Sequence, residues 1–77
     1  MSEYLVIESV VDAVNTMSKM EVINKLGLKP GIVWESYDEM LANADFDTLR
    51  KRVVVSMFKE NFESDEADLL IEEFQAQ

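Results

Sequence analysis

Apolar residues recur with a helical period along most of this chain. Between residues 4 and 17, Val6, Val10 and Val14 fall on one side of a 3.6-residue wheel, whereas Glu8 and Asp12 fall on the other. β-Branched residues near the start leave a strand conceivable, but apolar and polar positions do not alternate there. The pattern therefore predicts a helix over residues 4–17.

The next stretch carries a helix start and a helix stop. Ser18 and Glu21 have the spacing of a capping box, and Gly27 suits the left-handed residue that ends a helix. Pro30 suits the first turn of a following helix. We therefore predict one helix over 19–26, a tight corner, and a second helix over 31–44. The residues expected to point inward at this corner are Val22, Ile23, Leu26, Leu28 and Val33.

The predicted helix over 31–44 has two unlike faces. Its apolar arc comprises Val33, Trp34, Tyr37, Met40, Leu41 and Ala44. Glu35, Asp38 and Glu39 lie opposite that arc. The outer face of this helix should therefore be acidic.

Two further helices complete the pattern. An aspartate within 45–47 is expected to cap a helix over 48–61, and apolar residues cover more than half of that helix, which is typical of a central position in a bundle. Its cations, Arg50, Lys51, Arg52 and Lys59, are expected to pair with acids of neighbouring helices. Ser64 is the predicted cap of a last helix, whose inward residues are Ala67, Leu70, Ile71 and Phe74. The fold class is thus all-α, a compact bundle of four to five short helices forming one domain over residues 1–77.

The corner resembles a helix-turn-helix. The resemblance covers Glu21 to Glu35, with a glycine in the turn and apolar residues at fixed offsets around it. It implies that the helix over 31–44 would enter the major groove of DNA. However, that helix contains no lysine or arginine, and phosphate neutralisation needs such residues. DNA binding is therefore the third hypothesis, and we expect no direct contact with nucleic acid.

Composition sets the remaining limits. The chain has 77 residues, 48% of them hydrophobic, with no cysteine and no histidine. The usual base at neutral pH and the strongest nucleophile are therefore missing. A calcium loop at Asn43, Asp45 and Asp47 lacks the glycine and the final glutamate that such a loop needs. We expect no enzyme, cofactor or metal site. Acids among residues 1–17 disfavour a signal peptide or membrane span, which makes a cytoplasmic protein the expectation.

Charge is the feature that points to a function. The chain carries 16 acids and 7 bases, a net charge of −9, and residues 60–77 contain no base. Such a surface repels phosphates and attracts basic partners. We therefore predict a protein-binding module that docks on a basic partner, such as an inhibitor or a phage-type nucleic-acid mimic. The predicted contact residues are Glu35, Asp38, Glu39, Glu63, Asp65, Glu66, Asp68, Glu72 and Glu73.

An alternative rests on apolar residues that miss the inward faces. These residues are Leu5, Ile32, Val55 and Leu69. Single exposed apolar residues are common, but several together would form a patch. The alternative hypothesis is a structural or adaptor module that forms a homodimer through such a patch.

Overall fold

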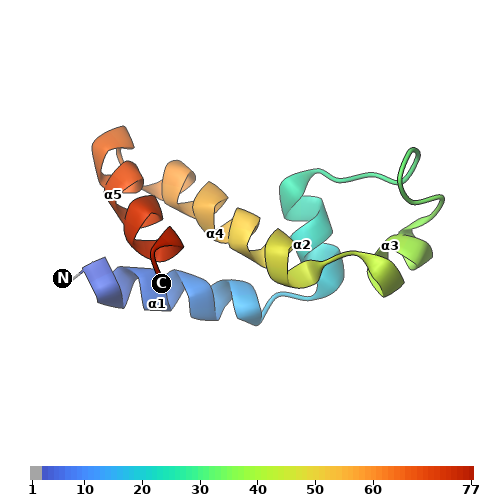
Figure 1. The fold of residues 1–77 in the computed structure, drawn as a ribbon, viewed down its shortest axis with the longest axis horizontal. Coiled ribbons are helices and arrows are strands. Elements are labelled where there is room, and N and C mark those ends of the chain that lie inside the picture. Colours follow the sequence, from blue (N-terminus) through green and yellow to red (C-terminus); the bar gives the residue numbers. More distant parts are fainter. Residues whose placement is uncertain (1–2) are drawn as a thin grey trace.

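The computed structural model describes residues 3–77 and consists of helices and their connections (Figure 1). The helices are α1 (Glu3–Asn15), α2 (Lys19–Leu26), α3 (Tyr37–Asn43), α4 (Phe46–Asn61) and α5 (Ser64–Gln75). The predicted all-α fold with up to five helices is confirmed.

The start and the end of α2 follow the predicted local chemistry. Ser18 Oγ accepts a hydrogen bond from the Glu21 N–H at 3.1 Å, and Glu21 Oε1 accepts one from the Ser18 N–H at 3.5 Å. Gly27 has a φ of 67°, and its N–H donates to the Asn24 carbonyl. The capping box and the glycine stop are therefore confirmed.

The second half of the predicted corner is wrong. Residues 28–36 are not helical, and α3 begins at Tyr37 rather than at Gly31. Gly31 has a φ of 155°, outside the helical region, and its N–H donates to the Trp34 carbonyl at 2.7 Å. Ser36 Oγ instead accepts from the Glu39 N–H and caps α3. Val33, predicted to point inward, is therefore exposed.

α4 lies at the centre of the fold, as predicted from its wide apolar surface. It contacts α1, α2 and α5. Phe58 is fully buried, and its ring meets those of Phe62 and Phe74 edge-on at centroid distances of 6.4 and 6.2 Å. The buried cluster comprises Ile7, Val14, Val22, Val53, Val54, Phe58, Ala67 and Leu70.

The caps and cations near α4 give a mixed outcome. Asp45 caps α4, as predicted, but Ser64 is the first residue of α5 rather than its cap. Arg50 donates to the carbonyls of Val14 and Met17 rather than to a carboxylate. Within residues 3–77 the one ion pair joins Lys25 and Glu60. The predicted pairing of the α4 cations with acids is therefore wrong.

The bundle is elongated, with principal extents of 42 × 21 × 19 Å. The segment 28–36 and α3 occupy one end, and α5 covers the other end together with the start of α1 (Figure 1). The surfaces of α3 and α5 are therefore separated along the long axis of the molecule.

Candidate functional site

The nine acids predicted as contact residues do not form one surface. Glu35, Asp38 and Glu39 lie on or just before α3, and the other six lie on or just before α5. These two helices occupy opposite ends of the molecule (Figure 1). A single partner surface would have to span most of the long axis to contact both groups.

Part of the α3 group serves the fold. Glu39 is half-buried, and its Oε2 accepts a hydrogen bond from the Glu35 N–H at 2.9 Å. Its backbone N–H donates to Ser36 Oγ at the start of α3. Glu39 thus fixes the entry to a helix of seven residues. Of this group, Glu35 and Asp38 have exposed side chains.

The α5 group is different, because all six of its acids are exposed. Glu63 occupies the N-cap position of α5 without a side-chain hydrogen bond, and Asp65 and Glu66 lie in the first turn, where the helix dipole favours negative charge. We call this group the α5 acidic face: Glu63, Asp65, Glu66, Asp68, Glu72 and Glu73. No side chain in this group makes a hydrogen bond or an ion pair within residues 3–77. Leu69 lies among these acids and is 53% exposed. The face therefore combines uncompensated negative charge with one apolar side chain.

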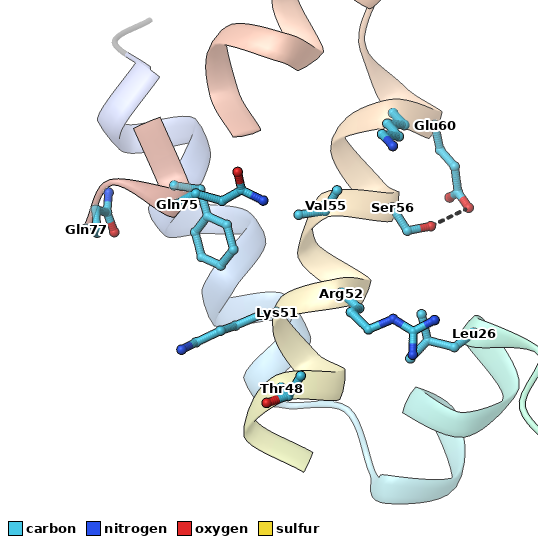
Figure 2. A pocket seen from close by; sticks show the side chains of 11 residues that line it. Leu26, Thr48, Lys51, Arg52, Val55, Ser56, Glu60, Gln75 and Gln77 are labelled. Atoms are coloured by element: carbon cyan, nitrogen blue, oxygen red, sulfur yellow. Dashed lines mark hydrogen bonds between the residues drawn. The ribbon is translucent and has the colours of Figure 1, made fainter. Parts of the chain in front are cut away.

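A groove along the outer side of α4 was not predicted from the sequence. Its volume is about 900 Å³, and Leu26 of α2 and Phe74 of α5 help to line it. Figure 2 shows Val55 in the middle, with Gln75 on one side and Arg52 on the other. Three of the seven basic residues of the chain line this groove, namely Lys51, Arg52 and Lys59. We call it the α4 basic groove.

Sequence reasoning missed the α4 basic groove because it assigned these cations to internal ion pairs. A signal was present: Arg52, Val55 and Lys59 recur at i, i+3 and i+7, which places them on one face of a helix. The bundle leaves this face uncovered, since Arg52 and Lys59 are exposed and Val55 is half-buried.

Two carboxyl groups have a lowered pKa: Glu60, which lines the α4 basic groove, and Asp45 at the start of α4. Lys25 Nζ donates to Glu60 Oε2 at 2.9 Å, and this hydrogen bond together with the lysine charge lowers the pKa of Glu60. At the start of α4, the hydroxyl and the N–H of Thr48 donate to the carboxylate of Asp45 and lower its pKa. Both carboxylates are thus held ionised by structural contacts, which gives them no proton to donate near neutral pH.

A second pocket lies between segment 28–36 and the α3–α4 region. Its volume is about 510 Å³, and it is lined by Pro30, Trp34 and Leu49 among others. Ile32 and Val33 are exposed on the same segment. This segment lies at the other end of the molecule from α5 and the start of α1 (Figure 1). The exposed apolar side chains of residues 3–77 therefore do not gather into one patch.

The geometry also bears on the other chemistries considered. Ten residues separate α2 from α3, whereas a helix-turn-helix joins its helices by three or four. Among the described residues, no group of three or more acidic, histidine or cysteine side chains is placed to hold a metal ion. No helix in residues 3–77 has both the length and the apolar character needed to span a membrane.

Comparison with protein-family models, with curated proteins and with solved structures gives no match.

Proposed function

We propose that this protein is a non-enzymatic binding module whose α5 acidic face docks on a basic surface of a partner protein. One observation carries the proposal: six exposed acids on and before one helix have no compensating cation within residues 3–77. Such a surface attracts lysine-rich and arginine-rich proteins over a distance of roughly 8 to 10 Å at moderate salt.

The shape of the helix supports a defined contact as well as a general attraction. Asp65 and Glu72 are seven residues apart, so they lie on one side of α5 at a separation of about 10 Å along its axis. Leu69 lies between them and is half-exposed. An apolar contact at the centre with charge pairs around it is the usual anatomy of a protein interface.

The class of partner follows from the charge. A row of carboxylates on a rigid helix presents negative charge to a cleft that otherwise holds a phosphate backbone. An inhibitor of a nucleic-acid-binding protein, acting as a mimic of the nucleic acid, is therefore the role we propose. The second acidic group at α3 is a separate surface and is not required for this contact.

The test is a comparative affinity capture from the native host. The baits are the parent chain, a variant with Glu66→Lys and Glu73→Lys, and a control with Glu8→Lys and Asp12→Lys. The control changes the charge by the same amount on exposed residues of α1. We expect a basic protein that is captured by the parent and the control and lost with the α5 variant, as measured by quantitative mass spectrometry.

Two results would reject the proposal. One is that every basic protein captured by the parent is lost equally with both variants, which would indicate attraction to net charge alone. The other is that the α5 variant captures the same proteins as the parent. In either case the α5 acidic face would have no specific role.

A further inference from the structure

Within residues 3–77, the α4 basic groove is a surface of opposite charge to the α5 acidic face. In a chain of net charge −9, it collects Lys51, Arg52 and Lys59. The hydrogen bonds from Thr48 and, to a smaller extent, the charge of Lys51 lower the pKa of Asp45, whereas Arg52 and Lys59 make no ion pair within residues 3–77. A ligand with negative charge would therefore gain Coulomb energy from Arg52 and Lys59.

The groove and the face also match in register. On the outer side of α4, Arg52, Val55 and Lys59 follow one another at intervals of three and four residues. On the outer side of α5, Glu66, Leu69 and Glu73 follow one another at the same intervals. Laid parallel, the two helices would place each cation opposite an acid and Val55 opposite Leu69, because both have the same rise per residue. Leu69 is 53% exposed and Val55 is half-buried, so both have surface left to cover.

We infer that the α4 basic groove binds α5 of a second copy of this chain. Each copy carries both surfaces, so two copies can exchange these contacts reciprocally, as a symmetric dimer requires. Two cation-to-acid contacts and one apolar contact then form at each of two equivalent places. The inference rests on the α5 acidic face of the proposed function, and a basic partner would have to displace the second copy to reach that face.

The total charge of the chain opposes this association. Two copies of net charge −9 repel each other, and added salt weakens both that repulsion and the local charge pairs. Salt dependence therefore does not separate the two effects. Reversing the charges of one surface and then of the other does distinguish net repulsion from local charge pairing, because the local pairs return when the two variants are mixed.

The experiment uses two full-length variants and their mixture. The groove variant carries Arg52→Glu and Lys59→Glu, and the helix variant carries Glu66→Lys and Glu73→Lys. Sedimentation equilibrium at low salt measures the dissociation constant of the dimer over a concentration series. We expect the parent chain to dimerise, and each variant alone to dimerise at least about tenfold more weakly, because like charges then face each other at both contacts.

The equimolar mixture is the decisive sample. Each acid then meets a cation at both contacts, so the mixture should regain the dimer of the parent chain. Attraction between opposite net charges cannot cause this recovery, because both variants are negative. From the parent charge of −9, the groove variant has −9 − 4 = −13 and the helix variant has −9 + 4 = −5. Far-UV circular dichroism checks helix content, and the milder pair of Arg52→Gln with Lys59→Gln and Glu66→Gln with Glu73→Gln replaces any variant that does not fold, with weakening of each as the expected result.

Three results would overturn the inference. They are a parent chain that stays monomeric, a mixture of variants that does not recover the dimer, and equal weakening by the α1 control with Glu8→Lys and Asp12→Lys. The groove variant also separates this inference from the proposed function. It keeps the α5 acidic face, so it should lose the dimer and still capture the basic partner.

Discussion

At Gly27 a single backbone angle decides how the chain leaves α2. Its φ of 67° lies in the left-handed region, where a side chain meets the backbone unfavourably. An added Cβ would meet no other atom within 4 Å, so the backbone conformation alone sets the cost of a substitution. Gly27→Ala should therefore lower the free energy of unfolding by about 1 kcal/mol, as measured by urea denaturation.

Asn24→Ala is the matched control for that measurement. Asn24 is exposed on the same helix, and only its backbone carbonyl takes part in the stop at Gly27. A change within about 0.5 kcal/mol is expected there. Equal stability of Gly27→Ala and the parent chain would contradict the left-handed conformation of Gly27.

The ion pair between Lys25 and Glu60 makes a prediction about pH. The pKa of Glu60 lies below its ordinary value of 4.5 in the folded chain, so the ionised carboxylate stabilises the fold above that value. This contribution is lost as the pH falls through the lowered pKa. Glu60→Gln should therefore be less stable than the parent chain at pH 7, and the difference should shrink in acid below the ordinary value.

Denaturant titrations at several pH values measure that difference. Glu8→Gln is the control, because Glu8 is exposed in the middle of α1 and its side chain makes no hydrogen bond or ion pair within residues 3–77. It should show no comparable closing of a stability gap. A gap between parent and Glu60→Gln that stays constant from neutral to strongly acidic pH would show that the ion pair does not stabilise the fold.

One arginine of α4, Arg50, holds the C-terminal end of α1 against α4. Arg50 donates to the Val14 carbonyl at 2.7 Å and to the Met17 carbonyl at 2.9 Å, at the end of α1. A cation at the end of a helix also interacts favourably with the helix dipole. Arg50→Met keeps the apolar stem, removes both hydrogen bonds, and should cost about 1.5 to 3 kcal/mol of unfolding free energy.

Lys51→Met provides the comparison for Arg50→Met. Lys51 is next in the chain and exposed, and it makes no ion pair within residues 3–77, although its charge acts on Asp45. Its replacement should change stability by no more than about 0.5 kcal/mol. If thermal and urea unfolding gave the same loss for both variants, Arg50 would have no special role in holding α1 to α4.

The ends of a helix could be predicted from the sequence where a local cap determines them. The bounds of α2 follow from Ser18 and Gly27, because caps act on backbone groups only a few residues away. The start of α3 did not follow, since Pro30 and Ser36 are both acceptable helix starts and the chain uses the second. Capping preferences do not decide between two helix starts when either one satisfies the free backbone N–H groups.

The candidate site was predictable only in part, for a related reason. The negative charge of α5 could be predicted because residues 60–77 contain no lysine or arginine. The α4 basic groove was not, because its existence depends on which side of α4 the other helices leave uncovered. The i, i+3, i+7 spacing of Arg52, Val55 and Lys59 indicates a shared face but not its exposure.

Across the whole molecule, the two predicted acidic groups lie far apart, and three cations of α4 gather in one groove. The acids of α3 and α5 lie at opposite ends of a bundle 42 Å long, and the unpaired cations of α4 line a groove between α2 and α5. A partner attracted only by the net charge of the chain would bind these surfaces without preference. A partner that contacts the specific arrangement of acids on α5 would bind that surface in preference.

The most direct test of the proposed docking surface is the dissociation constant of the captured basic partner, measured by calorimetry against three forms of the chain. Reversal of Glu66 and Glu73 to lysine on α5 should weaken binding by about tenfold or more. Reversal of Glu8 and Asp12 on α1, which changes net charge equally, should weaken it far less. Equal weakening by both variants would contradict docking through the α5 acidic face.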